Sequence, residues 1–296
     1  PYPDPQQMPK GQLMSKTIQQ LRVPCCYQGG KQRISSQIAD KLLAVYPNDN
    51  ERTHFYDLCC GSGAVTIELL NRGIKSDRIT MLDASSWGTF WKAIGEGSFN
   101  LESFKNELDQ IPEDKREVKA YMTKLSANGP EENEQYIYPI LQSCSFGGKQ
   151  IWLDNGKWSN AFFRDYWEPT KNSVRKSPAN PMQPSPDTLY RRVRELVYRC
   201  KGITCLKENI MDFASSKIHE RSVVYVDPPY QGTTSYGFDF DLNSFIGTFK
   251  ETNDAPLFVS EGIPLSDHAE ELVFGGAKGG ISGNKPKKHR EWLTRL

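Results

Sequence analysis

The tetrapeptide Asp227-Pro228-Pro229-Tyr230 follows a short apolar run at residues 222–226. The exocyclic amine of adenine is a poor nucleophile, because its lone pair is delocalised into the ring. A carboxylate, and a backbone carbonyl fixed by two prolines, can each accept a hydrogen bond from that amine and favour a pyramidal nitrogen. The tyrosine offers a flat face for a base that has left its stack. These residues therefore suit methyl transfer to a base amine, although the same tetrapeptide could form only a rigid turn.

A second segment, residues 57–63, reads Asp-Leu-Cys-Cys-Gly-Ser-Gly between an apolar run and a helix-prone stretch. Its two glycines let the backbone approach a ligand closely. The dinucleotide-binding fingerprint has a third glycine where Thr66 stands, and the Gly-Lys pair of a phosphate-binding loop is missing. The loop therefore suits a nucleoside cofactor without phosphates, and it disfavours a nicotinamide oxidoreductase.

Two further polar segments flank this loop in the sequence. Asp83 ends the apolar run at 79–82, where an acid commonly accepts hydrogen bonds from ribose hydroxyls, although it could also cap a helix. Residues 27–31 read Tyr-Gln-Gly-Gly-Lys. Lys31 could place a cation near the carboxylate of a cofactor.

Alternating strands and helices are needed to bring these segments together. The predicted elements are helices at 32–46 and 64–70, strands at 54–58 and 79–82, a helix from Ser185-Pro186 to Cys200, strands at 203–206, 222–226 and 255–259, and a helix between the last two. This order predicts an α/β fold with a parallel sheet and helices on both faces. The carboxyl ends of parallel strands share one edge, and open sheets bind ligands there.

The alternation stops after about residue 97, so an insertion of about 90 residues interrupts the α/β pattern. Residues 98–135 are charged and helix-prone, whereas 136–184 are aromatic and show no clear period. Aromatic side chains between Ser143 and Trp167 stand among basic residues and could stack on nucleic acid. They could equally form the core of a small subdomain, which we expect for most of them.

The overall composition narrows the class of protein. The formal net charge of the 296 residues is +1, so any surface for nucleic acid must be local. Candidates are Arg191, Arg192 and Arg194, and the segment 285–290. The seven cysteines show no metal-ligand spacing, which predicts mostly buried free thiols and no metal site. No apolar run is long enough to span a membrane.

Taken in order, the motifs resemble those of the Dam-type DNA adenine-N6 methyltransferases of bacteria and phages. The shared pattern is Tyr-x-Gly-Gly-Lys, Asp-x-x-x-Gly-Ser-Gly, Leu-Asp-Ala-Ser, a long insertion and Asp-Pro-Pro-Tyr, over residues 24 to about 94 and 186 to about 262. The chain departs from the family at Leu58-Cys59, where Pro-Phe is usual, and at Ser85, where the family has Asn.

The resemblance implies a Rossmann-like methyltransferase sheet that uses S-adenosylmethionine and flips adenine out of a specific DNA sequence. It implies catalytic roles for Asp227, Pro228, Pro229 and Tyr230. It implies cofactor contacts from Tyr27, Lys31, Asp57, Cys59, Gly61, Gly63, Asp83, Asp212, Phe213 and Asp227.

The same resemblance divides the chain into parts. We expect an N-terminal extension at 1–23, a catalytic domain at 24–97 and 185–296, and a target-recognition region at 98–184. It also implies a bacterial or host-cell cytoplasmic enzyme without a membrane, with a cognate restriction nuclease as a candidate partner. Alternative acceptors are RNA, cytosine N4 or a protein side-chain amide, and a further alternative is a non-catalytic nucleic-acid-binding protein. The early Gly-Gly-Lys segment and the long insertion favour DNA.

Overall fold

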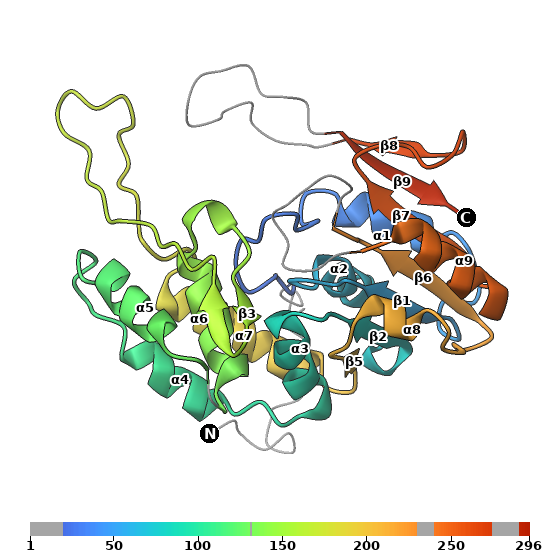
Figure 1. The fold of residues 1–296 in the computed structure, drawn as a ribbon, viewed down its shortest axis with the longest axis horizontal. Coiled ribbons are helices and arrows are strands. Elements are labelled where there is room, and N and C mark those ends of the chain that lie inside the picture. The colour runs from blue at the N-terminus through green and yellow to red at the C-terminus, as the bar shows by residue number, and fades with distance from the viewer. Residues whose placement is uncertain (1–19, 131, 230–239, 274–289) are drawn as a thin grey trace, which may run out of the picture.

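The computed structural model describes residues 20–130, 132–229, 240–273 and 290–296. Within them, a seven-stranded sheet has the order β5-β2-β1-β6-β7-β9-β8, and a separate hairpin pairs β3 with β4 (Figure 1). The strands are β1 (His54–Leu58), β2 (Ile79–Leu82), β3 (Trp152–Asp154), β4 (Lys157–Ser159), β5 (Thr204–Leu206), β6 (Ser222–Val226), β7 (Leu257–Glu261), β8 (Glu270–Leu272) and β9 (Glu291–Arg295). The helices are α1 (Ser35–Leu43), α2 (Ala64–Asn71), α3 (Ser86–Glu96), α4 (Leu101–Asp109), α5 (Val118–Ala127), α6 (Glu134–Cys144), α7 (Pro186–Arg199), α8 (Ile210–Phe213) and α9 (Leu242–Thr252), with 3-10 turns η2 (Ser76–Arg78) and η3 (Phe146–Gly148). No described helix is long and apolar enough to cross a membrane.

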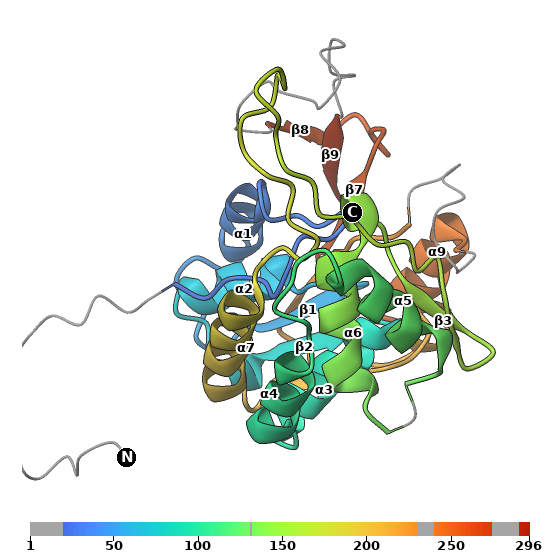
Figure 2. The same ribbon diagram turned by 90° about the vertical axis from the view of Figure 1, so that its left-hand side faces the viewer.

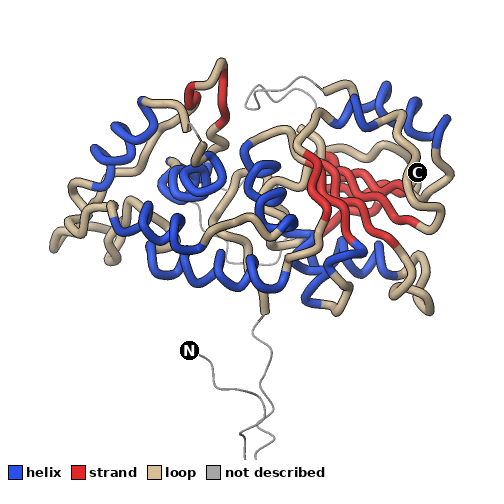
Figure 3. The backbone as a smooth tube through the Cα atoms, turned by 90° about the horizontal axis from the view of Figure 1, so that it is seen from below, coloured by secondary structure: helices blue, strands red, loops and turns tan. Residues whose placement is uncertain are grey.

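The parallel part of the sheet consists of strands that are buried on both faces. Every residue of β1, β6 and β7 is buried, as expected where helices cover both sides. Successive side chains point to opposite faces. Phe55 and Tyr225 belong to the core shared with α1, α2 and α3, whereas Tyr56 and Val224 belong to the core shared with α8 and α9. Helices accordingly lie on both sides of the strands in Figure 3, which confirms the predicted α/β class.

The last strands of the sheet reverse direction. β9 pairs antiparallel with β7, and β8 pairs antiparallel with β9. An antiparallel strand starts at the edge of the sheet where its parallel neighbours end. Glu291, the first residue of β9, therefore lies near the carboxyl ends of β6 and β7. The sequence analysis did not predict these two strands.

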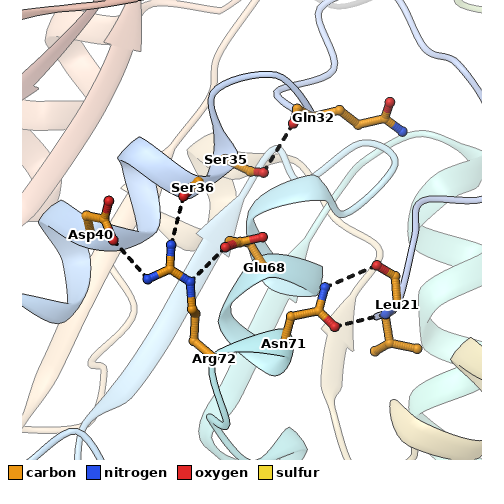
Figure 4. A network of polar contacts seen from close by, with 8 residues as sticks. All are labelled: Leu21, Gln32, Ser35, Ser36, Asp40, Glu68, Asn71 and Arg72. Atoms are coloured by element: carbon orange, nitrogen blue, oxygen red, sulfur yellow. Dashed lines mark hydrogen bonds and ion pairs between the residues drawn. The ribbon is translucent and has the colours of Figure 1, made fainter. Parts of the chain in front are cut away.

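Polar contacts fasten α1 and the chain before it to α2 (Figure 4). The guanidinium of Arg72 bonds to Asp40 of α1 at 2.9 Å and to Glu68 of α2 at 2.8 Å. Next to it, the Asn71 carboxamide accepts a hydrogen bond from the backbone N–H of Leu21 at 2.8 Å and donates one to its carbonyl at 3.1 Å. These contacts hold the segment that leads to Lys31 against the body of the sheet.

The predicted elements of the sheet are largely confirmed. β1, β2 and β6 have the predicted bounds, and α7 begins as predicted, with Ser185 Oγ accepting a hydrogen bond from the Thr188 N–H. The helix predicted at 32–46 is shorter, and the strand predicted at 255–259 lies two residues later. A helix, α6, lies largely in residues for which no helix was predicted from the sequence. Its residues from Tyr136 to Cys144 are all buried, and a helix buried all round has no polar face.

The inserted residues fold against the sheet domain. α4, α5 and α6 form a lobe beside α3 and α7 (Figure 2). The Trp87 ring of α3 meets the Tyr138 ring of α6 edge-on at 5.1 Å between centroids. Buried side chains of α6 belong to the same apolar cluster as those of α1, α2 and α3. The insertion therefore shares a continuous core with one face of the sheet.

We expect Gly63→Ala to lower the free energy of unfolding by more than the cost of placing an alanine in a left-handed backbone conformation. Gly63 has φ 75°, and a Cβ there would lie 2.4 Å from Cζ2 of Trp91. Gly73→Ala is the matched control, because Gly73 has φ 93° with open space around it. The control should cost about 1–2 kcal/mol, and Gly63→Ala clearly more, in denaturant unfolding. Equal losses would contradict the packing role of Gly63.

Candidate active site

Three acidic residues lie at the carboxyl ends of parallel strands, at one edge of the sheet. Asp57 lies in β1, while Asp83 and Asp227 directly follow β2 and β6. β1 and β6 adjoin at the point where the strand order changes direction, the usual ligand site of such sheets. A pocket that is partly open to solvent lies there. Its lining includes the predicted site residues Tyr27, Lys31, Asp57, Cys59, Gly61, Asp83, Asp227, Pro228 and Pro229.

Asp57 links the end of β1 to the first turn of α2. Its carboxylate accepts hydrogen bonds from the backbone N–H of Thr66 at 3.1 Å and from the Thr66 hydroxyl at 2.7 Å. Burial raises the pKa of Asp57 to about 6. Thr66, which replaces the third glycine of the dinucleotide fingerprint, thus fixes the carboxylate and the loop above it.

Asp83 holds the other side of the glycine loop. Its carboxylate accepts hydrogen bonds from the backbone N–H of Gly61 at 2.7 Å and of Ser85 at 2.9 Å. Burial raises the pKa of Asp83. The alternative that Asp83 caps the following helix is wrong, because Ser85 is the N-cap of α3 and accepts the Trp87 N–H. Asp83 therefore supports the loop and faces the pocket.

Asp227 shares Lys31 with a second carboxylate. The Lys31 ammonium lies 2.6 Å from Asp227 Oδ1 and 3.4 Å from Glu291 Oε1, and it donates to the Gly29 carbonyl at 2.9 Å. All three charged side chains are mostly buried. Burial raises the pKa of Asp227 to about 7; Lys31 lowers it and Glu291 raises it. Glu291 was missed by the sequence analysis, because no motif marks it and β9 was not predicted.

The glycine loop packs tightly against aromatic rings. A Cβ at Gly61 would lie 2.9 Å from the Tyr27 ring, so Tyr27 covers this part of the loop. Cys59 has φ 60°, a conformation that non-glycine residues rarely adopt. Burial and the surrounding carboxylates raise the pKa of its thiol well above the usual value, so the thiol stays protonated. Gly63 faces Trp91 and does not line the pocket.

The Asp212-Phe213 pair lies away from the pocket. Asp212 is exposed, and Phe213 is buried in the core beside Tyr56, with ring centroids 6.0 Å apart. Asn209 and Ile210, at the start of the same short helix, line the pocket instead. Asp212 and Phe213, for which the resemblance implies a cofactor contact, therefore do not line the pocket, whereas the residues at the start of their helix do.

Other predicted residues have different outcomes. Tyr230 and the basic segment up to 289 lie outside the described residues. Arg192 donates to the backbone carbonyl of Pro24 at 3.1 Å, so it packs the chain rather than forming a free basic patch. All seven cysteines are free thiols, and all but Cys26 and Cys59 are buried, as predicted.

The aromatic residues of the insertion do not mainly form a core. Trp158 and Phe163 are buried, but Phe146, Phe162 and Trp167 are 60%, 67% and 40% exposed. The expectation that most of them are core residues is wrong. The chain between α6 and α7 is largely loop, with only the short η3, β3 and β4 as regular elements.

Comparison with known proteins identifies the family. Residues 27–251 match the family described as D12 class N6 adenine-specific DNA methyltransferases. No curated protein matches the chain. Among solved structures, the chain resembles a Haemophilus influenzae protein provisionally named a methylase, with 11% identity and a TM-score of 0.32 over 88% of this chain and 97% of that one. A similarity this low bears on neither fold nor activity. The family match spans most of the chain and confirms the resemblance seen in the ordered motifs, so this protein belongs to the D12 class N6 adenine-specific DNA methyltransferase family.

Proposed function

We propose that this DNA adenine methyltransferase takes its methyl group from S-adenosylmethionine, and that the pocket at the strand ends holds both the donor and the target adenine. The observation that carries the proposal is the convergence of Asp57, Asp83 and Asp227 with the glycine loop on one pocket. These groups come from neighbouring strands, as a single ligand site requires.

The pocket residues suit a positively charged nucleoside without phosphates. Bound there, S-adenosylmethionine would supply a methyl group activated by its sulfonium. Asp83 lines the pocket, and its carboxylate already accepts hydrogen bonds from the Gly61 N–H and from the N–H and hydroxyl of Ser85. A carboxylate has about four acceptor positions, so Asp83 would still accept a hydrogen bond from a ribose hydroxyl. Lys31 is paired with Asp227 and Glu291, so the acids around the pocket outnumber this cation and favour a cationic ligand.

Asp227 would act on the amine of the target base. Its carboxylate accepts a hydrogen bond from one N–H, and a backbone carbonyl held by Pro228-Pro229 accepts the other. These two hydrogen bonds direct the nitrogen lone pair toward the methyl donor. Both hydrogen bonds strengthen as the nitrogen becomes pyramidal. Lys31 lowers the pKa of Asp227 and so opposes the effect of burial, although the resulting pKa is still about 7.

The target base has to leave the duplex to reach this pocket. Adenine N6 is paired inside DNA, and extruding the base costs a few kcal/mol. Residues 98–184 would recognise the target sequence, and the exposed Phe146, Phe162 and Trp167 supply faces that can stack on bases.

Under this proposal the enzyme acts in the cytoplasm of a bacterium or of a phage host. A restriction nuclease that recognises the same DNA sequence is a candidate partner.

The direct test of the substrate uses methyl-labelled S-adenosylmethionine and separate pools of DNA and RNA. After digestion, the label should appear as N6-methyladenine from DNA. Label in RNA, in N4-methylcytosine or in the protein itself would overturn the proposed acceptor.

Asp227→Asn should cut single-turnover methylation about 100- to 1,000-fold, the usual loss of one preorganised contact. The amide replaces one acceptor oxygen with a donor, so it opposes the amine. Binding of S-adenosylmethionine should stay within a few-fold of the unmodified protein. Asp254→Asn is the matched control, because Asp254 is exposed ahead of β7, at the opposite edge of the sheet. A folded Asp227→Asn protein with near-normal turnover would refute the assignment.

The pH dependence of methylation should report the ionisation of Asp227. Its pKa is raised to about 7, so the active, ionised form is lost as the pH falls through that value. Lys31→Met removes a group that lowers this pKa and should move the acidic limb of the rate profile to higher pH. Glu291→Gln removes a group that raises it and should move the limb to lower pH.

Single-turnover rates measured across the neutral range would test these shifts, with melting curves to show that each variant is folded. If the acidic limb of the rate profile fell at the same pH in the unmodified protein and in both variants, a group other than Asp227 would control the profile.

A further inference from the structure

Gln150 belongs to the inserted lobe, yet it is one of the residues that line the pocket at the strand ends. The residue is 5% exposed, and its side-chain oxygen Oε1 is buried without a hydrogen-bond partner among the described residues. Buried polar groups are nearly always hydrogen-bonded, because an unmade bond costs about 1–3 kcal/mol. Of the described residues with such an orphaned buried atom, Gln150 alone lines this pocket.

Hydrogen bonds on both sides fix the backbone around Gln150. Its carbonyl accepts a hydrogen bond from Asn160 Nδ2 at 2.7 Å, and the next N–H, of Ile151, donates to Gln142 Oε1 at 3.1 Å. Two residues earlier, the Gly148 carbonyl accepts the N–H of Gln28 at 2.8 Å. Gln150 is therefore held at the pocket by a segment that contacts both the lobe and the catalytic domain.

A second glutamine in the same lobe shows what a structural role looks like. Gln142 is 1% exposed, and its Nε2 donates to the carbonyls of Gly148 and Lys149 at 3.2 and 2.9 Å. Its Oε1 accepts the N–H of Ile151. The fold thus satisfies every part of the Gln142 carboxamide, but leaves the Gln150 oxygen without a partner among the described residues.

We propose that Gln150 is a binding residue for the nucleoside methyl donor, and that its Oε1 accepts a hydrogen bond from a hydroxyl or amine of that ligand. The inference rests on the proposed function of the pocket. The donor is favoured over the target base, because the segment carrying Gln150 is fastened at Gln28, next to Tyr27, which covers Gly61 of the cofactor loop. Binding of the donor then links the insertion to the catalytic domain.

The test measures binding of S-adenosylhomocysteine, the demethylated product, by titration calorimetry, so no turnover is needed. Gln150→Met keeps the length of the side chain but removes its polar atoms. It should raise the dissociation constant roughly 2- to 12-fold, the range of one neutral hydrogen bond. The melting temperature of the ligand-free variant should stay the same or rise, because an orphaned polar atom has been replaced.

Gln142→Met is the matched control. It breaks hydrogen bonds that the folded protein makes, so it should lower the melting temperature of the ligand-free protein. An equal loss of melting temperature in Gln150→Met would show that Gln150 is structural and overturn the inference. Unchanged product affinity in Gln150→Met, with or without weaker DNA binding, would also overturn it. Absence of product binding by the unmodified protein would overturn the proposed function as well.

Discussion

Several carboxylates are buried at one edge of the sheet, and the free-energy cost of burying them determines which groups must surround the site. Asp57, Asp83 and Asp227 are all largely removed from water, and burial raises the pKa of each. Buried charges persist only when hydrogen bonds or opposite charges compensate them. Each carboxylate has a different compensation: a threonine for Asp57, backbone N–H groups for Asp83, and the Lys31 ammonium for Asp227.

These compensations assemble the loops around the pocket. The bonds from Asp57 and Asp83 fix both sides of the glycine loop, and the ion pair with Asp227 brings in the segment before α1. Lys31 also lies near Glu291 of β9, so the antiparallel end of the sheet reaches the same site. A change in the charge of one member would alter the ionisation of its neighbours, because the groups share a buried environment. If the pocket is the active site that we propose, the same contacts support both folding and catalysis.

Much of this arrangement could be predicted from local signals in the sequence. Apolar runs ending in Asp57, Asp83 and Asp227 gave strands with the correct bounds, and an α/β sheet brings the ends of such strands together. The remaining features depend on non-local packing. α6 is buried from Tyr136 to Cys144, so solvent-exposed polar residues do not mark most of it. The first residue of β9, Glu291, forms an ion pair with Lys31, 260 positions earlier in the chain. Gln150 stands in no motif, and contacts with residues far from it in the sequence, such as that of Gly148 with Gln28, hold it at the pocket.

The central claim is that the pocket between Asp83 and Asp227 is the place where the methyl donor binds and the base amine is held. A crystal structure of the protein with S-adenosylhomocysteine tests this most directly. The account predicts product density over the glycine loop, with its ribose hydroxyls on Asp83 and its sulfur on the side of Asp227. Product bound at another surface, or in the pocket with its ribose away from Asp83, would contradict the account.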